Sequence, residues 1–257
     1  LTSWNSGTER MFQQAERERP RSDFAQWARR AYHILPKEGE DLVKLRLNSA
    51  QQHVMRAIER QVSAGKPVRL IILKGRQQGI STFIEAWQLF RTTQTRARNS
   101  LVLAHDADSA GALFEQSKRG YDNLPAILKP EIKRSNKKEL VFGRLDSRLE
   151  VATAGGRGIG RGKMFRYCHA SEVAFWPSSS AEANWNGLTQ TVPPTEDSAI
   201  FVESTANGMG NLFHRLWTEA VAGMSEFDPV FIPWFWQDEY RVMPPEGFER
   251  TPEEEDL

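Results

Sequence analysis

The sequence predicts an α/β fold in which helices flank a mainly parallel central β-sheet. From residue 68 onward, short runs of β-branched and aliphatic residues alternate with stretches of helical periodicity, a pattern typical of βαβ units. The run from Leu70 to Leu73 is apolar without alternation, as expected of a strand buried on both faces. The 257 residues, 39% of them hydrophobic and 26% charged, suffice for one large domain with a full core.

The composition narrows the function classes. A formal net charge of +1 gives no global argument for binding nucleic acid, so such a case must depend on local clusters. The one cysteine, Cys168, excludes a disulfide framework or a cysteine-based zinc site and suits a reducing cytosol. Apolar runs of only a few residues predict no membrane partner.

The individual elements follow from periodicity and capping signals. A helix over residues 22–34 is expected in an N-terminal helical appendage that covers residues 1–40, and a second helix begins after Asn48 or Ser49 as its N-cap. The main domain is expected over residues 41–242 and a Pro/Glu-rich linker over residues 243–257. The strands are predicted at residues 68–73, 100–104, 139–142, 148–153, 166–170, 199–203 and 230–233, and the later helices at residues 81–93, 108–121 and 211–222.

The first strand enters a glycine loop and leaves it into a helix, the layout that a phosphate-binding loop requires. Gly75 and Gly79 are one residue closer together than in the usual pattern, and Ile80 stands where lysine belongs. Lys74 or Arg76 is therefore expected to neutralise the γ-phosphate. The expected nucleotide-binding residues are Lys74, Gly75, Arg76, Gln77, Gln78, Gly79, Ile80, Ser81 and Thr82. The alternative is an ordinary strand-to-helix turn with incidental basic residues.

A second element is expected on the neighbouring strand, where an acidic strand end would face the metal and the attacking water. Residues 165–175 provide Ser171 where a magnesium-organising aspartate is usual and Glu172 where a water-activating glutamate is usual. The predicted Mg²⁺-binding residues are thus Ser81, Ser171 and Glu172. A surface glutamate at a strand end is the alternative interpretation of Glu172.

Two further segments supply polar groups. Ser204, Thr205 and Asn207 follow an apolar strand and are able to sense the γ-phosphate or the attacking water, although a helix N-cap and turn explains them equally well. Gln51, near the start of a helix, presents both a carbonyl and an NH₂ group, which suits the adenine edge. A solvated helix face is its alternative.

Two basic segments are candidates for contacts with other molecules. In the glycine-rich loop at residues 155–163, Arg157 or Arg161 could act as an arginine finger on a neighbouring subunit's nucleotide. Contact with a DNA backbone and a solvated loop are the alternatives. A solvated surface is the favoured interpretation of the second cluster, which comprises Lys133, Arg134, Lys137 and Lys138.

Taken in order, these motifs resemble the ATPase motif series of the large terminase subunits of tailed bacteriophages. The resemblance extends over residues 45–240 and rests on Gln51 and on residues 76–82, 100–106, 160–162, 170–175 and 204–208. It implies a P-loop NTPase fold of the additional-strand, RecA-like class that binds ATP and Mg²⁺. It also implies an adenine-reading Gln51, an early basic loop residue such as Arg76, and Arg161 as the arginine finger. A coupling motif after the third core strand is implied as well.

The resemblance further implies an ATP-driven motor that pumps double-stranded DNA into a procapsid. Its partners would be the portal protein, the small terminase subunit and further copies in a homo-oligomeric ring, in the host cell cytoplasm. No nuclease activity is expected in this chain, and residues 243–257 would lead to a nuclease domain. Ser171 removes a charge from the magnesium shell and, with Ile80, motivates the alternative of a nucleotide-binding assembly module with little hydrolysis. A helicase-like DNA translocase is the other alternative.

Overall fold

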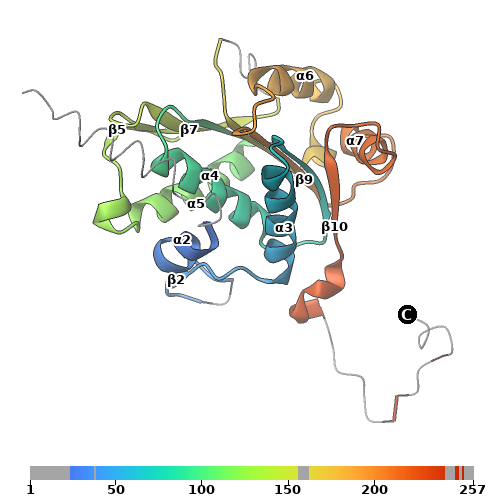
Figure 1. Ribbon diagram of the computed structural model, residues 1–257. Helices are drawn as coiled ribbons and strands as arrows, with labels where there is room; N and C mark the ends of the chain where they lie inside the picture. Colours follow the sequence, from blue (N-terminus) through green and yellow to red (C-terminus); the bar gives the residue numbers. More distant parts are fainter. Residues whose placement is uncertain (1–23, 38, 156–161, 241–246, 249–250, 252–257) are drawn as a thin grey trace, which may run out of the picture.

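The computed structural model describes residues 24–37, 39–155, 162–240, 247–248 and 251. Eight of the described strands form one sheet in the order β10-β3-β9-β8-β4-β7-β6-β5 (Figure 1). The parallel strands are β10 (Asp228–Ile232), β3 (Val68–Lys74), β9 (Ala199–Ser204), β8 (Tyr167–Ser171), β4 (Asn99–Ala104) and β7 (Ser147–Thr153). The antiparallel strands β6 (Glu139–Phe142) and β5 (Ile132–Ser135) extend the β7 edge. The predicted α/β fold with a mainly parallel sheet is confirmed.

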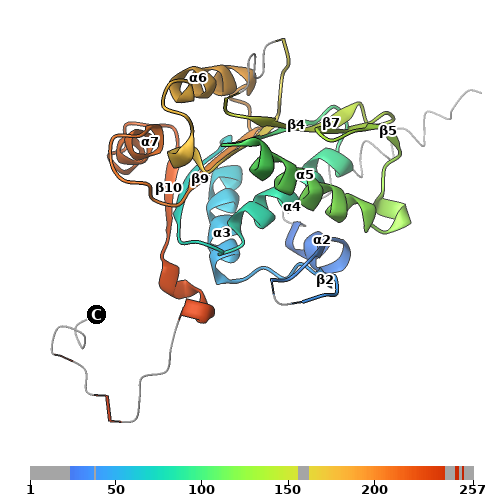
Figure 2. The same ribbon diagram turned by 180° about the vertical axis from the view of Figure 1, so that it is seen from behind.

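Helices cover both faces of this sheet (Figures 1 and 2). One face carries α2 (Phe24–Ala31), α3 (Ser49–Ser63), α4 (Ile80–Gln94) and α5 (Ala107–Asp122), and the other carries α6 (Ala181–Thr191) and α7 (Leu212–Val221). Leu70 and Ile72 of β3 pack in the core on the α3–α5 side, whereas Ile71 packs in the second core with α6 and α7. This double burial explains the uninterrupted apolar run of β3.

The N-terminal helix belongs to the main core. Phe24 and Ala28 of α2 are fully buried, and the ring of Phe24 meets that of Phe83 in α4 edge-on, with centroids 5.4 Å apart. The helix ends at Ala31, earlier than predicted, because the chain turns into the short strand β1 (His33–Ile34), which pairs with β2 (Val43–Lys44). Part of the expected appendage thus packs against α4 in the main core.

Asn48 begins α3 as predicted. Its Oδ1 accepts a hydrogen bond from the Gln51 amide at 2.8 Å, and the Gln51 side chain accepts one from the Asn48 amide at 3.0 Å. This reciprocal capping box satisfies two amides that the helix leaves free. It also places Gln51 directly beside the glycine loop.

Strand β5 and helix α6 were not predicted. Asn184, Gly187 and Thr189 have low intrinsic helix propensity, which weakens the sequence signal for α6. Burial of Trp185 and Leu188 against the sheet outweighs that preference. Across the described part of the chain, every helix falls short of the length and apolar character that a bilayer crossing requires.

Candidate active site

The glycine loop lies at the carboxyl edge of the sheet, between β3 and the N-terminus of α4. Gly79 precedes the helix with a φ of 71°, and Gln77 within the loop has a φ of 56°. These left-handed conformations turn the chain sharply from strand to helix. Amides in such a turn and the positive end of α4 together favour an anion, which is the requirement of a phosphate-binding loop.

The loop is fastened from both sides. Asn48 Nδ2 donates to the Gln78 carbonyl at 3.2 Å and Gln51 Nε2 to the Gly79 carbonyl at 2.8 Å, both from the start of α3. On the other side, Gln78 Nε2 donates to the Pro233 carbonyl at 2.7 Å, and the Tyr240 hydroxyl donates to the Arg76 carbonyl at 3.1 Å. The loop shape is therefore largely set before any ligand binds.

Gln51 serves the loop in this structure. The residue is 3% exposed, and both its amide oxygen and its amide nitrogen are hydrogen-bonded within the protein. Reading an adenine edge would require the side chain to exchange one of these bonds. Its role in base recognition stays a prediction.

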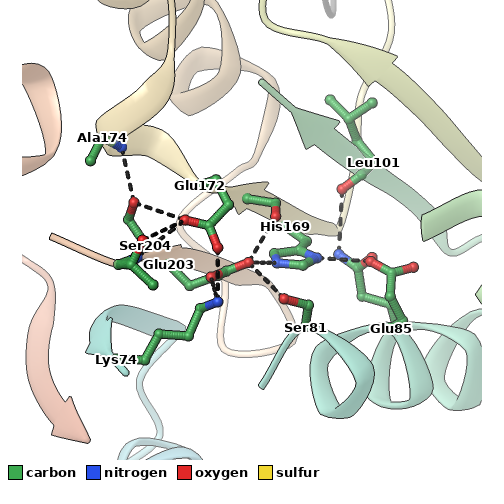
Figure 3. Close-up of polar contacts among 12 residues, drawn as sticks. Lys74, Ser81, Glu85, Leu101, His169, Glu172, Ala174, Glu203 and Ser204 are labelled. Atoms are coloured by element: carbon green, nitrogen blue, oxygen red, sulfur yellow. Dashed lines mark hydrogen bonds and ion pairs between the residues drawn. The ribbon is translucent and has the colours of Figure 1, made fainter. Parts of the chain in front are cut away.

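Lys74, the last residue of β3, is the cation at the centre of the site (Figure 3). Its Nζ lies 2.9 Å from Glu172 Oε1 and 3.0 Å from Glu203 Oε2. Burial alone would lower the pKa of Lys74, but the two carboxylates outweigh it and raise the pKa above its ordinary value. Of the two basic candidates, Lys74 thus lies among the acidic groups, whereas Arg76 is exposed on the loop.

Glu172 directly follows β8 in a left-handed conformation, with φ 49° and ψ 48°. A non-glycine residue in this region is uncommon and persists only when its surroundings hold it. Its Oε2 accepts hydrogen bonds from the Thr205 amide at 3.1 Å, from Ser204 Oγ at 3.3 Å and from Thr205 Oγ1 at 3.4 Å. The predicted catalytic and sensor residues are therefore in direct contact.

The sensor segment also contacts the turn after Glu172. The Ala174 amide donates to Ser204 Oγ at 3.2 Å, and Asn207 Nδ2 donates to the Ala174 carbonyl at 3.0 Å. Ser204, Thr205 and Asn207 thus connect the ends of β8 and β9. Asn211, which caps the following helix α7, donates to the Asn207 carbonyl at 2.9 Å, and the sensing role of the segment stays a prediction.

The placement of the acidic strand corrects one expectation. Strand β8, which precedes Glu172, is not adjacent to the loop strand β3, because β9 lies between them and pairs with both. The additional strand brings Glu203 to the centre of the site, in register with Ile72 of β3 on one side and Ser171 of β8 on the other. The prediction that the acidic strand neighbours β3 was wrong.

Glu203 is the site residue that the sequence analysis missed. It is fully buried, and its Oε1 accepts hydrogen bonds from Ser171 Oγ at 2.8 Å and Ser81 Oγ at 3.0 Å. The approach of Lys74 to its Oε2 is an ion pair that leaves this oxygen without a well-directed hydrogen bond. A carboxylate inside an otherwise apolar strand was the available signal, because unpaired charges are rarely fully buried.

A buried histidine links Glu203 to the core behind the site. His169 Nε2 lies 3.2 Å from Glu203 Oε1, and its Nδ1 lies 2.8 Å from Glu85 Oε1 of α4. Ser117 of α5 donates to the other oxygen of Glu85. Burial lowers the pKa of His169, but its hydrogen bonds and charge interactions with Glu203 and Glu85 outweigh this and raise the pKa to about 9.

The pKa of Glu203 is shifted downward by the cations beside it. Burial raises the pKa of its carboxyl, whereas Lys74 and His169 lower it further than burial raises it, so the pKa lies well below its usual range. Glu203 is therefore an ionised carboxylate between two cations.

Solved structures of three phage large terminases share this architecture. The large terminase of bacteriophage HK97 matches with a TM-score of 0.64 at 17% identity, over 81% of this chain and 43% of that one. The chain has the fold of a phage large-terminase ATPase domain. The Thermus phage P74-26 large terminase ATPase domain matches with a TM-score of 0.51 at 19% identity, over 64% of this chain and 75% of that one. The large terminase of a second thermophilic bacteriophage matches with a TM-score of 0.54 at 12% identity, over 74% of this chain and 46% of that one.

The terminase ATPase fold agrees with the resemblance in the sequence motifs. This chain spans less than half the length of the HK97 terminase and of the terminase from the second thermophilic phage. The latter protein has also been solved in complex with ADP, and that structure matches with a TM-score of 0.52. No protein-family model matches the chain.

Beside the glycine loop, Ser81 and the carboxylate of Glu203 are groups that fit a magnesium ion. Mg²⁺ is usually held by one or two carboxylates, with phosphate oxygens and waters completing its shell. The described residues contain no group of three or more His, Cys, Asp and Glu side chains arranged as metal ligands, so no all-protein cage is present among them. The donor set suits a cation that arrives with a nucleotide.

Thr82, the two arginines of the glycine-rich loop and the second basic cluster complete the set of predicted residues. Thr82 Oγ1 accepts a hydrogen bond from Gln116 of α5 at 2.6 Å. Arg157 and Arg161 lie outside the described residues. In the second basic cluster, Arg134 pairs with Glu139 at 2.9 Å on the antiparallel edge of the sheet.

Proposed function

We propose that this chain is the ATP-hydrolysing motor domain of a phage large terminase, which powers movement of double-stranded DNA into a procapsid. The observation that carries the proposal is the position of Lys74 between Glu172 and Glu203, directly before the glycine loop. It combines a phosphate-binding backbone, a cation and a held carboxylate at one edge of the terminase ATPase fold.

Lys74 is proposed to exchange partners when ATP binds. Its ammonium now pairs with Glu172 at 2.9 Å, and a γ-phosphate on the loop would compete for it with a higher charge. The exchange frees Glu172 Oε1 to orient the attacking water or to accept its proton. Bound at Ser81, Mg²⁺ would supply further neutralisation of the phosphate oxygens.

The end of β9 is proposed to report the product state. Glu172 Oε2 is held by the Thr205 amide, so a change at the γ-phosphate that moves Glu172 also moves Thr205. Asn207 transmits the same shift through the Ala174 carbonyl, and Asn211 caps the following helix α7. This route gives a physical basis for coupling hydrolysis to motion.

The proposal extends to two further arginines and to the molecules that assemble with this chain. A basic residue supplied by a neighbouring subunit, with Arg161 as the candidate, would accelerate hydrolysis by about 10³- to 10⁵-fold. Arg76 is exposed on the loop and is available to a nucleotide from the same subunit. Assembly as a ring on the portal protein, contact with the small subunit and DNA, and location in the host cytoplasm belong to the same proposal.

Phosphate release with Mg-ATP tests the proposal. The wild-type rate per subunit is expected to rise with protein concentration if an arginine acts between subunits, and Lys74→Ala is expected to abolish turnover. Arg76→Ala tests the exposed loop cation, and Lys118→Ala, which removes a surface ion pair with Asp122, is the control that should retain the wild-type rate. Full activity of folded Lys74→Ala would contradict the proposal.

Ser171 motivates a second candidate, a nucleotide-binding assembly module. The Ser171 hydroxyl stands where a charged metal-organising group is usual. In addition, the carboxylate of Glu172, the proposed catalytic group, is engaged in an ion pair with Lys74. Tight ATP binding without turnover, even in the presence of DNA and partner subunits, would select this candidate.

A further inference from the structure

The negative charge that is missing at Ser171 is present one strand away. Ser171 and Glu203 are directly opposite each other in the parallel register of β8 and β9, and Ser171 Oγ donates to Glu203 Oε1 at 2.8 Å. The longer side chain therefore brings a carboxylate to the hydroxyl at position 171. The site keeps a buried charge although the residue at the usual position is neutral.

The same carboxylate oxygen reaches the hydroxyl at the helix start. Ser81 Oγ donates to Glu203 Oε1 at 3.0 Å, from the first turn of α4 (Figure 3). A hydroxyl in this position is the expected inner ligand of a magnesium ion bound with ATP. Glu203 is thus placed to accept a hydrogen bond from a metal-bound water or to contact the metal itself.

The second oxygen of Glu203 is a spare acceptor. Although Glu203 is fully buried, its Oε2 has no well-directed hydrogen bond and only the ion pair with Lys74 at 3.0 Å. Burial of an incompletely satisfied carboxylate is strongly unfavourable, so such a group is typical of a functional site. If Lys74 moves to a phosphate, this oxygen loses its one close cation.

Glu172 is less suited to this task. Its Oε1 faces Lys74, and its Oε2 accepts from Ser204 and Thr205. Its side chain is 25% exposed, against 0% for Glu203. These contacts assign Glu172 to the attacking water and leave the metal to Glu203.

We infer that Glu203 supplies the magnesium-organising carboxylate that Ser171 lacks, acting with Ser81 when a nucleotide is bound. This inference rests on the proposed nucleotide-binding function and deepens it. Ser171 becomes a positioning residue that orients Glu203, and His169 holds the same carboxylate from behind at 3.2 Å.

The test compares the dissociation constant of ATPγS measured with excess Mg²⁺ and with excess EDTA, by titration calorimetry. The ratio of the two constants, the magnesium enhancement, is independent of turnover. Glu203→Gln is expected to reduce this enhancement by about 10- to 100-fold, the range for loss of a group that supports a metal. Affinity in EDTA should be unchanged or higher, since Lys74 then has one competing carboxylate fewer.

Two variants separate metal binding from general stability. Glu85→Gln changes the same buried network on the far side of His169, where the carboxylate bonds to His169 and Ser117, and is expected to keep the enhancement. The double variant Ser171→Asp with Glu203→Gln returns the charge to β8 and is expected to recover most of it. If Glu203→Gln does not fold, Glu203→Asp keeps the charge, shortens its reach and should reduce the enhancement.

The outcomes distinguish this inference from the proposed function. Absence of ATPγS binding by the folded wild-type chain in either buffer would overturn the proposed function. A wild-type enhancement that Glu203→Gln or Glu203→Asp retains in full would overturn the inference and leave the proposed function standing. Loss in the single variant with recovery in the double variant would establish it.

Discussion

The ammonium of Lys74 and the carboxylate of Glu203 lie 3.0 Å apart across neighbouring strands, with side chains 8% and 0% exposed. Each charge offsets part of the burial cost of the other in a place where neither would be stable alone. A ligand on the glycine loop that moves Lys74 therefore also changes the stability of this edge of the sheet. A ligand that draws Lys74 away must compensate Glu203 at the same time.

Removing Lys74 should destabilise the fold. Lys74→Ala leaves Glu203 buried with less compensation, and loss of one partner of a buried ion pair costs about 3–5 kcal/mol in the free energy of unfolding. Urea denaturation measures the change, with Lys163→Ala as the control at a more exposed pair. A loss below about 1 kcal/mol, the range of surface pairs, would contradict the importance of this contact.

Stability should fall as pH rises above 6.5, through His169. Its pKa is raised from 6.5 to about 9 in the folded protein, so the stabilisation is complete below pH 6.5 and is lost as pH rises through about 9. The change is on the order of a few kcal/mol. Thermal unfolding across this window should show a steeper decline for wild type than for His169→Gln; equal slopes would exclude a charged His169.

Gly75→Ala should disturb the loop. A Cβ at this position would lie 2.9 Å from Trp234 Cα and 2.9 Å from Gln78 Nε2, so the backbone must shift. We expect ATPγS affinity to fall at least about tenfold, since a loss of about 1.4 kcal/mol in binding free energy already has that effect. Calorimetry measures it.

Gly111→Ala is the matched control for this substitution. Apart from the adjoining residues and backbone of α5, no atom of the described residues lies within 4 Å of its added Cβ, and alanine in a helix is favoured by about 0.5–1 kcal/mol. It should be neutral or stabilising with unchanged affinity. Equal affinities in the two variants would show that the contact with Trp234 does not shape the loop.

Local signals predicted the regular elements well. The Asn48 cap, the apolar run of β3 and the glycine turn before α4 each depend on neighbouring residues, and each was found within one or two positions of its prediction. Helix α6 was missed because its stability comes from burial of Trp185 and Leu188, a tertiary effect that overrides weak propensity.

Site residues could be predicted from the sequence only where a single local motif contains them. Lys74 and Glu172 were predicted as site residues from their own motifs, but the sequence does not show that β9 lies between β3, which ends at Lys74, and β8, which Glu172 follows. Glu203 has partners from three different elements, namely Lys74 of β3, Ser81 of α4, and His169 and Ser171 of β8. No local sequence pattern predicts that these residues meet, although a charged residue within an apolar strand indicated a buried and paired carboxylate.

The central claim is that this chain hydrolyses ATP with Glu172 acting on the attacking water. The most direct test measures ATP affinity and phosphate release together for wild type and Glu172→Gln. The account predicts that Glu172→Gln binds ATP at least as tightly as wild type while its turnover falls by about 10²- to 10⁴-fold. Wild-type turnover in the folded variant would contradict it.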